Sequence, residues 1–176
     1  MKVAVVIGHE PKSKGAFSPY LAMSEYDYNS EVVKHLPDDI AIYRRKPGVG
    51  YQKQMRLLAD EMNPEKFDLV IELHFNAANN LAHGCEALIY KKNASSRLFG
   101  GLFCRNITKA YGTRDRGVKE LEVPSDRGFY FVYYQSANAL ILEPFFGDNP
   151  EAKKFLDPKK YACIIETTIN DYMAAL

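Results

Sequence analysis

The chain has 176 residues, enough for one domain with a single hydrophobic core. Hydrophobic residues make up 47% of the sequence and charged residues 26%, as in ordinary globular proteins, and the formal net charge is only +1. Because the chain has no basic block and no acidic tail, its charge does not indicate a nucleic acid or an anionic membrane as the main partner.

The amino-terminal segment does not have the features of a signal peptide. Its apolar run, VAVVI, is shorter than the roughly 7–15 residues of a signal h-region. No stretch of the chain approaches the roughly 18 apolar residues that a membrane-spanning helix needs. The three cysteines, Cys85, Cys104 and Cys163, lack CxxC spacing, which favours reduced thiols over a disulfide or a metal site. We therefore expect synthesis in the cytoplasm without a signal peptide.

Segments typical of strands alternate along the chain with segments of helical periodicity. Residues 3–8 (VAVVIG) form a continuous apolar, β-branched run, as in a strand buried on both faces. A helix is expected over 24–36, where Ser24 is a suitable N-cap. The other expected elements are a strand over 40–44, a helix over 50–62, strands over 68–76 and 85–90, a helix over 96–111 capped by Gly112, strands over 127–134 and 139–146, and a helical region over 150–175 that breaks near Pro158.

This alternation predicts an α/β fold built around a mostly parallel sheet, in a single domain spanning residues 1–176. Two pairs of expected strands look like hairpins: 68–76 with 85–90, and 127–134 with 139–146. Hairpin partners are antiparallel, so these pairs predict a mixed sheet.

Three polar residues stand at or near the carboxyl ends of expected strands. His9 follows the first strand, His74 lies near the end of the strand over 68–76, and Glu143 lies near the end of the last strand. Pro144 then prevents further regular pairing. Ligands of α/β sheets bind beyond the carboxyl ends of the strands, so these side chains converge on one edge if their strands are parallel.

Glu25 is a fourth candidate, because it begins the helix that Ser24 caps and continues the apolar stripe of that helix toward the core. A buried carboxylate without a partner is very costly, and a metal cation would be a suitable partner. A simpler interpretation is that Glu25 is an anion stabilised by the helix dipole.

Two imidazoles and one carboxylate are a common ligand set of catalytic zinc sites, which leave one coordination position open for water. We therefore assign one zinc ion to His9, Glu25 and His74. Taken singly, His9 also fits an ordinary loop residue and His74 a hydrogen-bonded core histidine. The assignment depends on the three residues meeting in space.

Glu143 is the candidate general base, since a metal ion acidifies water and a nearby carboxylate can take the proton. Glu72 is the alternative base. Strand alternation places Glu72, His74 and Asn76 on one face, so Glu72 could instead orient the imidazole of His74 as an outer-shell partner. Asn76 could bind substrate, position His74, or simply end the strand.

Several short motifs occur in an order that resembles the zinc-dependent N-acetylmuramoyl-L-alanine amidases of the Amidase_3 type. They are GH after the first strand, then EYDYN, LHFNA, GCEALIY and LILEPFFGDN. Each motif is weak alone, but together they extend from residue 3 to about residue 172. The resemblance implies cleavage of the amide between N-acetylmuramic acid and L-alanine in peptidoglycan. It also implies a fold with a twisted mixed sheet that has helices on both faces.

The resemblance also implies zinc bound by His9, Glu25 and His74, with Glu143 as the catalytic carboxylate. Two positions depart from the family pattern. Glu10 stands beside the first ligand where family members often have GHGG, and Glu72 replaces an apolar or small residue. We expect Glu10, Glu72 and Asn76 to bind substrate or to support the ligands. The Glu-Leu-His variant is similar to catalytic domains of some bacteriophage endolysins.

The resemblance takes up nearly the whole chain, so no separate cell-wall-binding domain is expected. A phage or prophage lysin without a signal peptide would be made in the cytoplasm and act on the wall after release. Peptidoglycan is the expected partner, and the sequence gives no oligomeric state.

Two other classes of function remain open at this point. Another zinc amidohydrolase or carboxypeptidase, acting on small acyl-amino acids, would use the same metal chemistry. A non-enzymatic wall-binding relative would not need all of positions 9, 25, 74 and 143. A nucleotide-binding domain is disfavoured, because neither GxGxxG nor a P-loop follows any expected strand.

Overall fold

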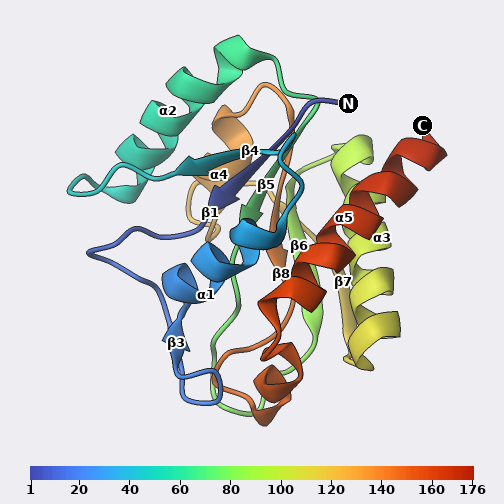
Figure 1. Cartoon of the computed structure of the whole chain (residues 1–176). Coiled ribbons are helices and arrows are strands. Elements are labelled where there is room, and N and C mark those ends of the chain that lie inside the picture. The colour runs from blue at the N-terminus through green and yellow to red at the C-terminus, as the bar shows by residue number, and fades with distance from the viewer.

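A six-stranded sheet in the order β4–β1–β5–β8–β6–β7 forms the centre of the protein in the computed structural model, which describes residues 1–176 (Figure 1). β4, β1, β5 and β8 are mutually parallel, whereas β6 is antiparallel to β8 and parallel to β7. The sheet is therefore mixed and mostly parallel, as predicted. Its strands are β1 (Val3–Ile7), β4 (Ala41–Arg44), β5 (Leu69–Leu73), β6 (Cys85–Tyr90), β7 (Asp115–Leu121) and β8 (Asn138–Glu143).

Helices cover both faces of this sheet. In Figure 1, α3 and α5 lie side by side over one face and α2 lies over the other. The α-helices are α1 (Glu25–Val32), α2 (Tyr51–Met62), α3 (Ala94–Tyr111), α4 (Phe129–Tyr134) and α5 (Pro158–Ala175). The short elements are β2 (Phe17–Ser18), β3 (Met23–Ser24), and the 3-10 turns η1 (Val33–His35), η2 (Asn63–Glu65) and η3 (Pro150–Phe155).

The helix ends follow the expected chemistry. The hydroxyl of Ser24 accepts a hydrogen bond from the backbone N–H of Asp27 and so caps α1. Gly112 ends α3 in the left-handed conformation, with φ of 62°. The carboxylate of Asp157 caps α5 directly before Pro158, which separates this helix from η3. These caps confirm the helix boundaries predicted near Ser24, Gly112 and Pro158.

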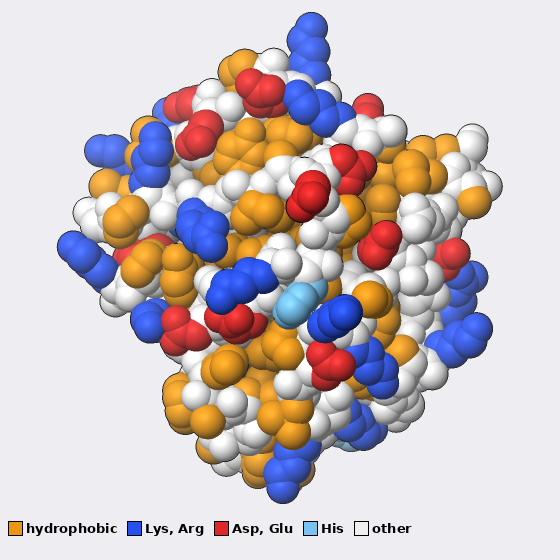
Figure 2. Space-filling model, in the orientation of Figure 1, with side chains coloured by type: hydrophobic (Ala, Val, Ile, Leu, Met, Phe, Trp, Pro, Cys, Tyr) orange, Lys and Arg blue, Asp and Glu red, His pale blue; other side chains and the backbone are white.

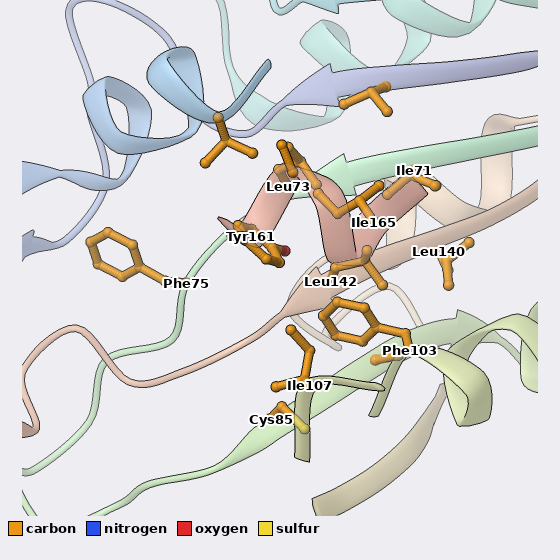
Figure 3. Packing of buried hydrophobic residues seen from close by; sticks show 14 of the residues in the cluster. Ile71, Leu73, Phe75, Cys85, Phe103, Ile107, Leu140, Leu142, Tyr161 and Ile165 are labelled. Carbon is orange, nitrogen blue, oxygen red and sulfur yellow. The ribbon is translucent and has the colours of Figure 1, made fainter. Parts of the chain in front are cut away.

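Two hydrophobic clusters lie on opposite faces of the sheet, because successive side chains of each buried strand point to opposite sides. The larger cluster lies under α1, α3 and α5, and the smaller one under α2 and α4. Figure 3 shows the larger cluster, in which β5 and β8 contribute Ile71, Leu73, Leu140 and Leu142, α3 contributes Phe103 and Ile107, and α5 contributes Tyr161 and Ile165.

Neither predicted hairpin is present. β5 pairs with β8 rather than with β6, its successor in sequence, and β6 inserts between β8 and β7. The antiparallel pair that makes the sheet mixed is therefore β6 with β8. The chain passes through 11 residues between Leu73 and Cys85, which is too long for a tight two-residue turn and allows β6 to lie beyond β8.

The prediction of a strand over 127–134 was wrong, because Phe129–Tyr134 forms the helix α4. The run FYFVYY is apolar at every position, so its periodicity does not distinguish a buried strand from a helix. In the fold, β5 and β6 occupy both edges of β8. No place beside β8 remains for another strand, and Phe129 and Val132 pack instead on the smaller cluster as a helix.

The sequence analysis missed β7, whose segment DRGVKEL is polar and contains Gly117 at a positive φ of 75°. β7 is an edge strand that pairs only with β6, and most of its side chains are partly or fully exposed. A strand in that position needs little apolar sequence, so hydrophobic periodicity gives only a weak signal for it.

The three cysteines are free thiols, as expected. None of the helices combines the length and hydrophobicity that crossing a membrane requires. On the face seen in Figure 2, basic and acidic side chains are interspersed, and no region of a single charge dominates.

Candidate active site at the carboxyl edge of the sheet

The carboxyl ends of β1, β5 and β8 meet at one edge, as the sequence predicted. The register aligns Ile7 with Leu73 and Leu73 with Leu142, so His74 and Glu143 each follow directly at this edge. The backbone N–H of His74 donates to the carbonyl of Leu142 over 3.1 Å and extends the ladder beyond the strands. His74 and Glu143 therefore project from neighbouring strand ends, and His9 stands two residues after β1.

Glu25 reaches the same edge from α1. Its side chain is buried, with 4% of the residue exposed. Its Oε1 accepts a hydrogen bond from the backbone N–H of Phe75, and its Oε2 accepts one from that of Ala16, both over 3.1 Å. These bonds fix the carboxylate between the end of β5 and the loop after β1. The expectation that Glu25 points inward is confirmed.

The structure brings His9, Glu25 and His74 together. Nε2 of His9 lies 3.1 Å from Oε2 of Glu25, and Nδ1 of His74 lies 2.8 Å from Oε1 of the same carboxylate. One potential ligand atom from each residue lies within 4.8 Å of the others. Two nitrogen donors and one oxygen donor facing each other match the chemistry of a divalent metal site of the zinc type.

The charges around this cluster also suit a cation. Burial alone would raise the pKa of Glu25, but hydrogen bonds from His74 and His9 outweigh it and hold the pKa far below its usual value. Burial would lower the pKa of His74, yet Glu72 and Glu25 raise it to about 10. His74 thus lies between two carboxylates, those of Glu25 and Glu72.

The backbone around His9 is shaped for this arrangement. His9 has a positive φ of 66°, a conformation that costs free energy for residues other than glycine and often occurs at functional sites. Gly15 passes close by, because a Cβ there would lie 2.6 Å from Nε2 of His9. Sequence reasoning gave no sign of either feature.

Gly8 leaves the space that the ring of His74 occupies. A Cβ at Gly8 would lie 2.6 Å from Nε2 of His74 and closer still to the carbonyl oxygen of Leu73. Neither neighbour can yield easily, since one is backbone and the other is a packed ring. The substitution Gly8→Ala should therefore displace His74.

We expect Gly8→Ala to lower the free energy of unfolding by about 1–3 kcal/mol and to weaken metal binding. Denaturant unfolding and metal titration would measure the two effects. Gly101→Ala is a matched control, because a Cβ at this helical glycine meets nothing within 4 Å and should stabilise the protein by about 0.5–1 kcal/mol. Native stability and metal affinity in Gly8→Ala would contradict the prediction.

Glu143 is buried, with 8% of the residue exposed, and its Oε2 has no hydrogen-bond partner. Burial is the main cause that raises its pKa to about 8, and the nearby charge of His74 only partly opposes the rise. A carboxyl group with a pKa near neutrality and a free oxygen can both accept and return a proton in the same reaction. Pro144 follows, and β8 ends at Glu143, three residues before the predicted end of this strand at residue 146.

Glu72 lies behind His74 and is fully buried. Its Oε2 is 3.1 Å from Nε2 of His74, and its Oε1 pairs with Arg45. Sequence reasoning missed Arg45, although it directly follows the carboxyl end of β4 and so obeys the rule that identified the other residues. Arg44 and Arg45 are adjacent in sequence, and only the fold shows that Arg45 turns inward while Arg44 is exposed.

Asn76 and Glu10 occupy different places around the cluster. The side-chain amide of Asn76 donates a hydrogen bond to Glu86 over 2.8 Å rather than to His74. Glu10 is buried and its Oε2 accepts a hydrogen bond from the backbone N–H of Lys12 over 2.7 Å. Both residues line the cavity, in reach of a bound molecule.

A cavity of about 770 Å³ opens over this edge of the sheet. Its lining includes His9, Glu25, His74 and Glu143, together with residues of the loop before α4, Tyr51 and Tyr130. A mostly parallel sheet with such a cluster in a cleft at its carboxyl edge defines an α/β domain with a candidate metal centre.

Comparison with known proteins identifies the family. Residues 3–174 match Amidase_3, described as N-acetylmuramoyl-L-alanine amidase. The match takes in almost the whole chain, so the protein belongs to this family of amidases, which act on peptidoglycan. The search of curated proteins found no match.

Solved structures with similar folds include several amidases. An N-acetylmuramoyl-L-alanine amidase from Clostridium difficile 630 is 22% identical, with a TM-score of 0.78 over 98% of this chain and 96% of its own. The catalytic domain of the CD27L endolysin, which targets the same species, is 22% identical, with a TM-score of 0.81 over 97% of each chain. CwlD from Clostridioides difficile, in complex with the GerS lipoprotein, is 16% identical, with a TM-score of 0.81 over 100% of each chain.

Proposed function

We propose that this amidase depends on one zinc ion bound by His9, Glu25 and His74, and that it cleaves the amide between N-acetylmuramic acid and L-alanine. The observation that carries the proposal is the approach of two imidazole nitrogens to the two oxygens of one buried carboxylate. A divalent ion in such a site lowers the pKa of water and polarises the carbonyl of the scissile amide.

Glu143 is the proposed general base. It accepts the proton of the attacking water through its free Oε2 and passes that proton to the amine nitrogen as the C–N bond breaks. The products are a lactyl carboxylate on the sugar and a free amino group on L-alanine. The raised pKa of Glu143 makes its carboxylate a stronger proton acceptor than that of an ordinary glutamate.

Glu72 is less suited to act as the base. Both nitrogens Nε and Nη2 of Arg45 lie within 2.8 Å of its Oε1, and no part of Glu72 is exposed. The charge of Glu72 is thus already paired with Arg45, whereas Oε2 of Glu143 has no partner. We propose that Glu72 supports His74, and that Glu10 and Asn76 line the substrate cleft.

Digestion of purified cell walls followed by mass spectrometry tests the proposed reaction. The expected products are stem peptides that begin with free L-alanine and glycan strands that keep intact N-acetylmuramic acid. Cleavage of small acyl-amino acids with no release from intact walls would favour the alternative amidohydrolase. The large cleft favours the wall, since it exceeds the space that a single acyl-amino acid would fill.

Removal of the metal gives a second test. We expect a strong chelator to abolish hydrolysis and added zinc to restore it, because the water and the carbonyl lose their activating ion. Turbidity of a cell-wall suspension measures the activity, and metal analysis before and after treatment measures the zinc content. Full lysis by protein shown to contain no metal would reject the zinc mechanism.

We also propose a role as a phage or prophage lysin that acts on the wall after release. The likeness to the catalytic domain of the CD27L endolysin supports this role. Lysis of susceptible cells by protein added from outside would test it, and hydrolysis of purified walls without lysis of any cell would count against it.

A further inference from the structure

Arg127 differs from the other charged side chains that line the cavity, because it has no partner of opposite charge. The acidic residues of the lining are Glu10, Glu25, Glu72, Asp126 and Glu143, and its two arginines are Arg45 and Arg127. Arg45 is buried and paired with Glu72, whereas Arg127 is exposed and forms no ion pair. An anionic group of a bound molecule would therefore be accommodated best at the guanidinium of Arg127.

The loop that carries Arg127 is held in shape by the preceding residue, Asp126. Oδ2 of Asp126 accepts hydrogen bonds from the backbone N–H groups of Glu122 and Val123, over 2.7 Å and 3.0 Å. The backbone carbonyl of Asp126 accepts a further bond from the N–H of Phe129 over 3.1 Å. The carboxylate of Asp126 thus closes the loop by bonding to its backbone and leaves the arginine unpaired.

Gly128 holds the same loop against β8. It has a positive φ of 93°, and a Cβ at this position would lie 2.4 Å from Cδ1 of Ile141. Ile141 and Glu143 are two residues apart on β8, so their side chains point to the same side of the sheet, and both line the cavity. The backbone next to Arg127 is therefore packed on the part of β8 that presents Glu143, the proposed base.

The proposed substrate carries its negative charge on one side of the scissile bond. The sugars of the glycan are N-acetylated and neutral, and the lactyl carboxyl group of N-acetylmuramic acid is already part of the amide. Carboxylates remain only on the stem peptide, which ends in one and can carry others on acidic residues. An arginine that binds an anion in this cavity would therefore recognise the peptide rather than the glycan.

We infer that Arg127 binds a carboxylate of the stem peptide and makes the enzyme prefer walls in which this group is free rather than amidated. The inference rests on the proposed cleavage before L-alanine and adds a residue that determines specificity on the peptide side. A guanidinium can hold a carboxylate through two parallel charge-assisted hydrogen bonds, which are about twice as strong as bonds between neutral groups. Amidation of the stem should therefore weaken binding without changing the scissile bond.

One preparation of cell walls with free stem carboxylates, used in two forms, tests the inference. Treatment with a carbodiimide and ammonia converts the carboxyl groups of the stem into carboxamides and leaves the neutral glycan unchanged. Initial rates of stem-peptide release at wall concentrations below saturation are proportional to kcat/KM. We expect the wild type to cleave the untreated walls about tenfold faster than the amidated walls.

Arg127→Met should cleave both forms of the wall at similar rates, because the charge that distinguishes them is gone. Arg127→Lys keeps the charge but not the planar, two-pronged geometry, so it should retain part of the preference. An effect of Arg127 that acted only through the nearby Glu143 would change the rates on both forms equally and leave the preference intact. Equal rates of the wild type on the two forms, or an unchanged preference in Arg127→Met, would overturn the inference.

Arg105→Met is the matched control, because it removes the same charge from an exposed pair with Asp171 that lies outside the cavity. It should keep the wild-type preference for untreated walls. If Arg105→Met lost the preference as well, net charge rather than a site at Arg127 would be its cause, and the inference would also fail. Wild-type enzyme that releases no stem peptide from either form would instead refute the proposed function.

Discussion

Glu143→Gln is expected to reduce hydrolysis of cell walls by about 10²–10⁴-fold while zinc remains bound. Glutamine keeps the shape of the side chain but cannot accept the proton of the attacking water. Because Glu143 is not one of the three proposed ligands, the metal content should not change. Rates of wall digestion and metal analysis of the same protein sample measure the two quantities. A variant with near-native rates would make Glu72 the favoured base.

The pH dependence of stability provides an independent check on Glu143. Its pKa is about 8 in the folded protein against an ordinary 4.5, so the folded state holds the proton more tightly than the unfolded state. The wild type therefore loses stability as the pH rises from about 4.5 to about 8. Glutamine cannot ionise and avoids this loss.

In metal-free protein, Glu143→Gln should thus be more stable than wild type above pH 8, by an amount on the order of 5 kcal/mol. Below about pH 4.5, the two proteins should be nearly equal. Urea unfolding at several pH values measures the difference. If the difference in unfolding free energy between the two proteins did not grow with pH, the pKa of Glu143 would not be raised in the folded protein.

Removal of a proposed ligand should have the largest effect on metal binding. We expect His9→Asn and His74→Ala to lose zinc. Losing a residue that hydrogen-bonds to a metal ligand lowers metal affinity about 10–100-fold, and losing a ligand itself should lower it more. Asparagine at position 9 tolerates the positive φ there, so the fold should be retained. Both variants should also lose hydrolysis, because the water and the carbonyl are no longer activated.

Two other histidines provide matched controls for these variants. His35 in η1 and His83 in the turn before β6 are exposed and lie outside the cleft. His35→Ala and His83→Ala should keep both zinc and activity. Full zinc occupancy in His9→Asn or His74→Ala would count against the proposed site, whatever the activity of the variant.

The residues at the carboxyl edge were predictable because each stands at a point that sequence alone can mark. His9, His74 and Glu143 interrupt or end apolar strands, and Glu25 begins a capped helix on its buried side. Placing His9, His74 and Glu143 together required only the assumption that β1, β5 and β8 are parallel, and the register of these strands confirms it. Local patterns of this kind survive folding, since buried polar groups must find partners.

The order of the strands and the surroundings of the site were decided by tertiary structure. Hydrophobic periodicity reports burial but not the neighbour that buries a strand, so it could not place β6 between β8 and β7. The same ambiguity made the apolar run of α4 look like a strand. Arg45 and Gly8 act through residues distant in sequence, one by pairing with Glu72 and the other by leaving room for His74.

The sequence by itself determined the alternation of strands and helices and the chemical character of the residues at the strand ends. Only the folded chain determined that Nδ1 of His74 faces Glu25 while Nε2 faces Glu72 and Arg45. The physical reason is that side-chain type is a local property, whereas the partner of each ring nitrogen depends on contacts between β4, β5 and α1, which are far apart along the chain.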